Sequence, residues 1–337
     1  MNRVQLQGLD FSAQEDVREA RILVMINILL AYVLALAHTS KSLHFLEWTT
    51  FIAFEGWLPF QSRVLPFLIA HGLDAIQHLS PRSIGRLFLA LDFAGALLAA
   101  TFLLKSLQAI GSTRTGMLLA LTVFWWQVFA TFVVSPVHNY YYPYDLLSVG
   151  IMSLGTWAIL TQQRIGVLAL IGTVGMLNRE TAILLPMLYL AANWTGDRTV
   201  RLNFLILLAI CLLVRLSIHF ALNAPGGATS PYVKTGELRF FYNFAFISLK
   251  SSAMHTFNVL FAFGGAWLLL LLRGATPPRL NHMALCFIPY FIGMSVVGNL
   301  SEIRVFGEFI PLLSLMLGCK LVPHPDTFHP THISQHA

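Results

Sequence analysis

Long apolar runs recur along almost the whole of this 337-residue chain and restrict the folds open to it. A run of about 18 or more apolar residues is long enough to cross the hydrocarbon core of a bilayer as a helix. Only 11% of the residues are charged, whereas soluble domains have about one quarter. The runs do not alternate as barrel strands do, and a backbone in lipid must satisfy its own hydrogen bonds. The sequence therefore predicts an all-α, polytopic transmembrane helical bundle.

The apolar runs predict about ten spans within a single membrane domain, residues 1–320. The expected spans are residues 22–38, 86–104, 116–134, 145–161, 165–177, 181–194, 203–222, 255–272, 281–299 and 305–319. The fifth and sixth runs are short, so they are either tilted spans or a broken helix pair that lines a cavity. The long first loop, residues 39–85, carries two interrupted apolar patches, which predict interfacial or re-entrant helices.

Basic residues at the ends of the runs predict the orientation of the chain. Arg18 and Arg21 precede the first expected span, and positive charge favours the cytoplasmic side. Ten spans then leave both termini in the cytoplasm, with residues 321–337 as a disordered tail, and put the first loop outside. A further span at residues 59–78 would make eleven and reverse everything downstream. The net charge of +6 is spread over the ends of the runs, which favours membrane lipids as partners and argues against nucleic acid.

Four polar stretches at the ends of apolar runs carry the candidate functional residues. They are residues 54–66, 140–145, 178–180 and 301–304. In the ten-span arrangement all four lie on the outer side of the membrane, so we expect them to form one site there. Glu55, with Glu47 in reserve, is the candidate catalytic base, because a base must be ionised and must reach an acceptor hydroxyl. A solvated loop carboxylate is the alternative for both residues.

Three arginines are the candidate residues for binding a donor phosphate: Arg63, Arg179 and Arg304. A guanidinium binds phosphate through two parallel hydrogen bonds. Each arginine also has a structural alternative. Arg63 could anchor the chain at the membrane interface, and Arg179 could pair with Glu180. Arg304 is four residues before Glu308, which predicts a shared helix face.

The remaining candidates are substrate-binding side chains: Tyr141, Tyr142, Tyr144, Asp145, Asn178, Glu180 and Glu302. The tyrosines are equally typical of an aromatic belt at a membrane interface. Asp145 either caps the following helix or orients a sugar or a cation. No spacing demands a metal, and Asp145 and Glu180 are the candidate ligands if a divalent cation takes part. Asp92 and Arg215 lie inside expected spans, where they either pair with each other or extend to the interface.

Three motifs carry a resemblance to a known superfamily. The stretch GMLNRETAILLP, Gly175 to Pro186, resembles the arginine-bearing helix pair of the polytopic GT-C glycosyltransferases. PFQSRVLP and SEIRVFGEFIP resemble motifs of uncharacterised bacterial membrane proteins related to that superfamily. The resemblance implies a pocket at the outer face of a bacterial inner membrane and a donor sugar on a polyprenyl phosphate. It also implies a catalytic carboxylate in the first outer loop, usually Asp; between residues 39 and 73 this chain offers only Glu47 and Glu55.

The expected function is therefore transfer of a sugar from a polyprenyl-phosphate donor to a glycan, lipid or protein acceptor. Two other classes stay open. A transporter or flippase of lipid-linked sugars would use the broken helix pair around Asn178 as a site near the middle of the membrane. A non-catalytic membrane subunit would serve a polysaccharide assembly system by positioning a partner enzyme.

Overall fold

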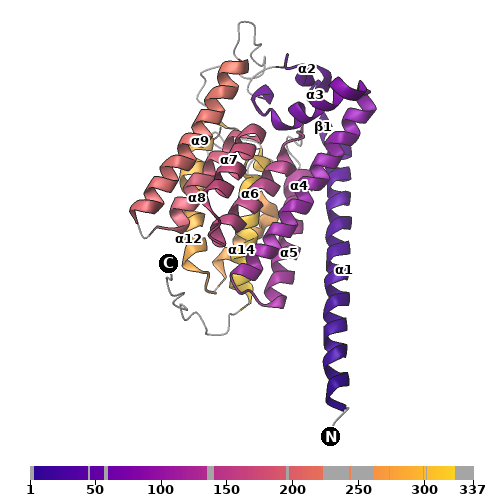
Figure 1. Ribbon diagram of the computed structural model, residues 1–337, viewed down its shortest axis with the longest axis vertical. Helices are drawn as coiled ribbons and strands as arrows, with labels where there is room; N and C mark the ends of the chain where they lie inside the picture. Colours follow the sequence, from indigo (N-terminus) through magenta and orange to yellow (C-terminus); the bar gives the residue numbers. More distant parts are fainter. Residues whose placement is uncertain are drawn as a thin grey trace, which may run out of the picture.

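The computed structural model describes residues 4–44, 46–56, 60–134, 140–194, 197–222, 243, 261–272, 274–298, 300 and 302–322. Most of these residues lie in helices that pack side by side (Figure 1), which confirms the predicted all-α helical bundle. In this part of the chain the only strands are β1 (Leu43–His44) and β2 (Tyr140–Tyr141). They pair in parallel and join the end of the first helix to a polar stretch in the middle of the chain.

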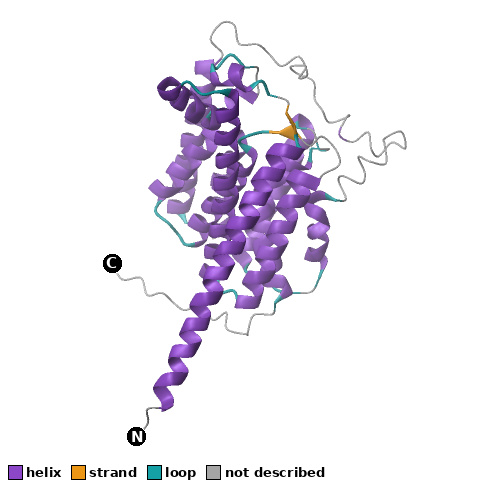
Figure 2. Ribbon diagram, turned by 90° about the vertical axis from the view of Figure 1, so that its right-hand side faces the viewer, coloured by secondary structure: helices purple, strands orange, loops and turns teal. Residues whose placement is uncertain are grey.

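The first helix, α1 (Val4–Lys41), runs along one side of the bundle and extends past it toward the N-terminus (Figures 1 and 2). The first loop then folds into α2 (Trp48–Ile52), the 3-10 turn η1 (Phe60–Ser62) and α3 (Leu65–Gln77). α3 has a proline in its first turn, where proline is tolerated, and ends at His78 with a left-handed backbone (φ 49°). The first loop is thus helical as predicted, and its depth in a membrane stays a prediction.

The central helices begin at capped ends. Ser80 precedes α4 (Pro81–Ala109) and Thr113 precedes α5 (Arg114–Phe129), and each side chain accepts a hydrogen bond from a backbone N–H of the first turn. The π-helix η2 (Ala130–Val134) continues α5, and α6 (Asp145–Leu160) follows β2. These caps explain why α4 and α5 start five and two residues before the apolar runs expected at residues 86 and 116.

The described residues after α6 also lie mainly in helices. They are α7 (Ile165–Asn178), η3 (Glu180–Ile183), α8 (Leu184–Ala192), α9 (Arg198–Leu222), η5 (Ala262–Leu271), α12 (Pro278–Leu285), α13 (Phe287–Val297), η6 (Ile303–Phe309) and α14 (Ile310–Leu321). Two expected spans are interrupted. Phe263, Gly264 and Gly265 have positive φ inside η5, and the run 281–299 divides at Cys286. Residues 255–260 and 323–337, within the expected eighth span and tail, lie outside the described residues.

Four of the described helices are long and apolar enough to cross a membrane: Arg18–Lys41, Pro81–Ala109, Arg114–Val134 and Arg198–Leu222. They coincide with four of the expected spans. The apolar helices Asp145–Leu160, Ile165–Asn178, Glu180–Ala192 and Ala262–Leu271 are shorter. The structure thus supports a helical bundle suited to a membrane, and the count of about ten spans stays a prediction.

α4, α5, α6 and α14 form the centre of the bundle. Their fully buried side chains include Leu103, Phe124 and Leu315. α4 and α6 approach closely at a glycine, because a Cβ added to Gly95 would lie 2.6 Å from the backbone of Leu146. α1 and α9 lie at the edge of the bundle. Only 22% and 17% of the residues in their most apolar 18-residue stretches are buried. Most of the apolar surface of these two helices therefore faces outward.

Candidate functional site

The four polar stretches converge near α2, α3 and β1, which lie at the end of the bundle opposite the N-terminus (Figure 1). Nη1 of Arg63 donates a hydrogen bond to the Tyr144 hydroxyl at 2.8 Å, which joins the first loop to the start of α6. The Asn178 amide, at the end of α7, donates to the Tyr144 carbonyl at 2.9 Å. Arg304 of η6 donates to the Tyr140 carbonyl at 2.5 Å. Residues from four separate stretches therefore form one cluster.

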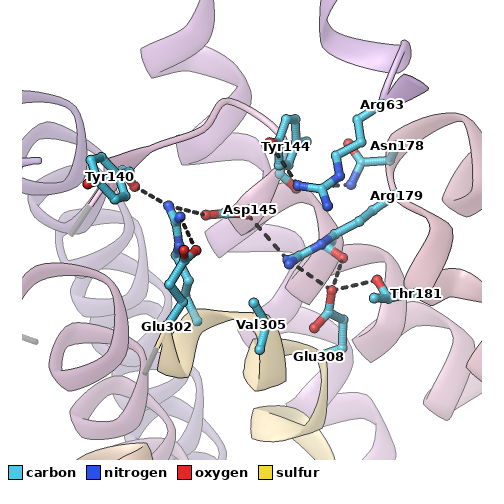
Figure 3. A network of polar contacts seen from close by, with 12 residues as sticks. Arg63, Tyr140, Tyr144, Asp145, Asn178, Arg179, Thr181, Glu302, Val305 and Glu308 are labelled. Atoms are coloured by element: carbon cyan, nitrogen blue, oxygen red, sulfur yellow. Dashed lines mark hydrogen bonds and ion pairs between the residues drawn. The ribbon is translucent and has the colours of Figure 1, made fainter. Parts of the chain in front are cut away.

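A buried ion network lies at the centre of this cluster (Figure 3). Arg179 lies between two carboxylates, with Nη1 3.3 Å from Asp145 Oδ1 and 3.1 Å from Glu308 Oε1. Nη1 of Arg304 is 3.7 Å from Asp145 Oδ2. All four residues are at most 5% exposed. Buried charges are costly unless they are paired, and here two guanidiniums face two carboxylates.

The local backbone directs these side chains inward. α7 ends at Asn178, and the extended backbone of Arg179 (φ −161°, ψ 140°) turns the chain into η3. Asp145 is the first residue of α6, where a negative charge is favourable beside the helix N-terminus. The capping role considered for Asp145 is wrong, because Tyr144 is the N-cap residue and no side chain caps this end. The Asp145 carboxylate pairs with Arg179 and Arg304 instead.

Glu308 is a network residue that is absent from the predicted site. Its Oε1 accepts hydrogen bonds from Ser148 at 2.9 Å and Thr181 at 2.7 Å, besides the contact with Arg179. The shared helix face expected for Arg304 and Glu308 is wrong. Residues 303–309 form the 3-10 helix η6, which has about three residues per turn, so positions four apart are not aligned. Its position could have been noticed in the sequence, because a glutamate beside a long apolar run is unusual.

Arg63 and Glu180 form a more accessible ion pair at the edge of the network. Nε and Nη2 of Arg63 donate to the two carboxylate oxygens at 3.1 and 2.6 Å. The side chains are 13% and 35% exposed. Burial alone would raise the pKa of Glu180. The charge and hydrogen bonds of Arg63, together with the charge of Arg179, outweigh burial and hold that pKa at about 2. Glu180 therefore pairs with Arg63, in place of the pairing with Arg179 considered from the sequence.

Stacked aromatic rings connect Arg63 to Arg304. The ring centres of Phe60 and Tyr142 are 5.3 Å apart, and those of Tyr142 and Tyr144 are 5.2 Å apart. The Arg304 guanidinium lies 4.1 Å from the Tyr142 ring centre, and the Arg63 guanidinium lies 4.7 Å from the Tyr144 ring centre. These are cation–π contacts. Burial raises the pKa of both tyrosines, so their hydroxyls stay protonated.

The other predicted carboxylates lie at the rim of the network or outside it. Glu302 binds Nη2 of Arg304 at 2.6 Å and is 23% exposed. Glu47 precedes α2, Glu55 follows it, and both are exposed. Neither of these two side chains forms a hydrogen bond or ion pair with any residue that the structure describes. The assignment of a catalytic base to Glu55 or Glu47 stays a prediction.

Tyr141 belongs to a second buried cluster beside the network. Its ring centre is 4.9 Å from that of His38, whose Nδ1 is 2.8 Å from Asp92 Oδ2. Asp92 thus pairs with His38 and not with Arg215, which donates to the Ser62 carbonyl at 3.5 Å. His38 was not predicted as a site residue, because a lone histidine at the end of an apolar run has no distinctive spacing.

The network keeps unused hydrogen-bonding capacity. Four buried atoms have no hydrogen-bond partner in the described part of the chain: Asp145 Oδ2, Asn178 Oδ1, Arg179 Nε and Glu308 Oε2. A buried polar group left in this state costs about 1–3 kcal/mol. No group of three or more metal-binding side chains occurs among the described residues, and Asp145 and Glu180 bind different arginines. The network therefore suits a polar ligand held by hydrogen bonds.

An apolar cavity of about 380 Å³ adjoins the network through η6. Its aromatic lining consists of Phe263, Trp267, Phe287, Phe291, Phe306 and Phe309. η6 also carries Arg304 and Glu308 of the network. One short helix therefore separates a charged, hydrogen-bonding region from an apolar cavity.

The arrangement combines cationic groups, stacked aromatic rings and an apolar cavity at one end of a helical bundle. Such a combination can bind an amphipathic anion. In comparisons with known proteins, no protein-family model, no curated protein and no solved structure matches the chain.

Proposed function

We propose that the protein is a membrane glycosyltransferase that moves a sugar from a polyprenyl-phosphate donor to an acceptor hydroxyl at the outer face of the membrane. The meeting of Arg63, Arg179 and Arg304 beside an apolar cavity carries this proposal. A lipid phosphate has the complementary chemistry, an anionic head joined to a long apolar chain. We assign the first isoprene units of the donor to the cavity. The resemblance of Gly175 to Pro186 to the GT-C superfamily favours the same class.

The arginines take different roles in this proposal. Arg179 is enclosed by buried carboxylates, so a phosphate would have to displace them to reach it. Arg63 and Arg304 hold Glu180 and Glu302, whose side chains are 35% and 23% exposed and can turn into solvent. We therefore assign donor phosphate binding to Arg63 and Arg304. Arg179 positions the carboxylates behind them.

The reaction needs a proton acceptor and a stabilised leaving group. The acceptor hydroxyl oxygen attacks the anomeric carbon of the sugar, and the bond from that carbon to the phosphate oxygen breaks. Glu55, with Glu47 in reserve, takes the hydroxyl proton, and the polyprenyl phosphate leaves as an anion. Arg63 and Arg304 stabilise the negative charge that grows on it. Because Glu55 is on the surface, the first loop has to close over the bound donor.

Donor binding and sugar transfer test these roles separately. Purified protein in detergent would be titrated with polyprenyl phosphate, and transfer would be followed with a polyprenyl-phosphate sugar. We expect Arg63→Gln and Arg304→Gln each to weaken polyprenyl-phosphate binding about tenfold or more, the effect of losing a charged hydrogen bond. Arg164→Gln is the matched control, because Arg164 is exposed and precedes α7 at the other end of that helix. Glu55→Gln should abolish transfer and leave binding unchanged.

Unchanged affinity in both arginine variants would overturn the lipid-phosphate site. The other two functions then give different results. A transporter or flippase moves a labelled lipid-linked sugar across liposomes in the absence of any acceptor. A non-catalytic subunit supports its assembly system even after the combined loss of Glu55 and Arg63.

A further inference from the structure

His38 and Asp92 form an ionisable pair inside the bundle, apart from the proposed donor site. His38 belongs to α1 and Asp92 to α4, two of the described helices that are long and apolar enough to cross a membrane. Both side chains are 0% exposed, and Nδ1 of His38 is 2.8 Å from Oδ2 of Asp92. Ionisable groups at such positions are costly and are usually functional. The pair therefore needs an explanation beyond helix packing.

A purely structural hydrogen bond would use one atom of each side chain, but this cluster contains further buried polar atoms. His38 Nε2, Asp92 Oδ1 and the Tyr141 hydroxyl are all buried and have no hydrogen-bond partner among the described residues. They come from α1, α4 and β2, so three separate elements bring polar groups to one place. A buried polar group without a hydrogen-bond partner costs about 1–3 kcal/mol. If the contact between these helices served stability alone, apolar residues in these positions would make the fold more stable.

The surroundings of the pair contain few other charges. Tyr141 packs on His38, and the His44 ring of β1 lies 5.2 Å from the Tyr141 ring. The charge of Asp145, at the start of α6, also acts on Asp92. Burial first, and then the charge of Asp92, raise the pKa of Tyr141 well above its ordinary value. The Tyr141 hydroxyl therefore keeps its proton.

We propose that His38, Asp92 and Tyr141 form an internal proton-binding site. A proton taken up from water joins the His38 imidazole and makes an imidazolium that faces the Asp92 carboxylate. Its release restores a neutral ring hydrogen-bonded to the same carboxylate, and no other bond forms or breaks. Tyr141 stands in the stretch that also supplies Asp145, so the charge of this site changes next to the ion network. The inference does not rest on the proposed sugar transfer.

Nitrogen-15 NMR of the histidine rings in the full-length protein in detergent tests the proposal. The chain has 12 histidines, and the difference between wild type and His38→Gln isolates one ring. We expect that ring to change from imidazolium to neutral as the pH is raised. Asp92→Asn and Tyr141→Phe should move this transition. Asp74→Asn is the control. It alters a carboxylate on α3 that accepts a hydrogen bond from the backbone N–H of Leu79, and it should leave the transition of the His38 ring unchanged.

A His38 ring that keeps one charge state at every pH where the protein stays folded would overturn the proposal and leave a fixed structural hydrogen bond. The proposal would also be overturned if the pH of the transition were the same in wild type, Asp92→Asn and Tyr141→Phe. If His38→Gln does not fold, the two other variants still assign the ring, because they keep the imidazole and perturb only its neighbours.

Discussion

Asp145 is shared by Arg179 and Arg304, so its loss affects two guanidiniums at once. The carboxylate is 1% exposed, and neither arginine can turn to water in its place. Removing one partner of a buried ion pair leaves an uncompensated charge, which is far more costly than removing an exposed partner. Asp145 is therefore the residue on which the network depends most.

We expect Asp145→Asn to destabilise the protein by about 3–5 kcal/mol, the usual cost of breaking a buried pair. Glu302→Gln should cost much less, because Glu302 is 23% exposed and water can replace its role at Arg304. Thermal unfolding of both variants in the same detergent checks this difference. Equal losses in the two variants would contradict the distinction between the centre and the rim of the network.

The pair of Arg63 and Glu180 predicts a particular pH dependence. Against the effect of burial, Arg63 holds the pKa of Glu180 at about 2, below the ordinary value of about 4.3. The stabilisation from this pair is therefore complete above about pH 5 and is lost as the pH falls toward about 2. We expect the difference in melting temperature between wild type and Glu180→Gln to stay constant near neutral pH and to shrink below about pH 4. Glu47→Gln, at an exposed glutamate, should show no such difference.

At the residue scale, the sequence indicated which charges matter better than it indicated their partners. Arg63, Arg179 and Arg304 stand out because charge beside aromatic residues at the end of an apolar run is unusual. The partners of Arg63 and Arg179, Glu180 and Asp145, come from positions that only the folded chain brings together. Glu302 lies two residues before its partner Arg304. Spacing along one helix was a poor guide, since η6 is a 3-10 helix and α7 ends at an extended residue.

At the scale of elements, the crossing of α4 and α6 sets the position of the network. A Cβ at Gly95 would lie 2.6 Å from the Leu146 backbone, and one at Gly150 would lie 2.6 Å from the Gly95 carbonyl oxygen. Small residues let helix backbones approach closely in membrane proteins. Leu146 follows Asp145, so any shift of α6 against α4 also moves the shared carboxylate.

We expect Gly95→Ala and Gly150→Ala each to destabilise the protein by about 1–3 kcal/mol, the usual cost of overpacking, and to weaken donor binding by moving Asp145. Gly166→Ala on α7 is the control, because no atom lies within 4 Å of an added Cβ there. Melting temperature and polyprenyl-phosphate affinity measure the two effects. A pair of stable variants with normal affinity would show that the crossing tolerates separation.

The positions of the helices were largely predictable, and so was the break at Arg179, but two other interruptions were not. Apolar length predicts a helix in lipid because the backbone has no other partner. It does not reveal that positive φ at Phe263, Gly264 and Gly265 breaks one run, or that another divides at Cys286. Such breaks depend on contacts with neighbouring helices, such as the hydrogen bond from the Trp126 indole to the Gly264 carbonyl.

At the scale of the whole molecule, the two ends of the bundle should face opposite sides of the membrane. Cys211, Cys286 and Cys319 are free and buried, so a cysteine-free background is a conservative change. In that background we expect Glu55→Cys and Glu302→Cys to react with an impermeant thiol reagent added outside. Arg164→Cys should react only after the membrane is opened. Labelling of Glu55→Cys and Glu302→Cys from different sides would contradict a single outer site.

The contacts of the network also bear on how the chain is made. Glu308 lies 160 residues after Ser148 and 127 residues after Thr181, the two hydroxyl residues that it accepts from. A ribosome adds residues in sequence, so Asp145 and Arg179 are made long before η6. Until then their charges depend on each other, on water or on an insertion chaperone. Chains cut short before η6 lack Glu308 and should for this reason be recognised and degraded by membrane quality control, even though the helices before it are complete.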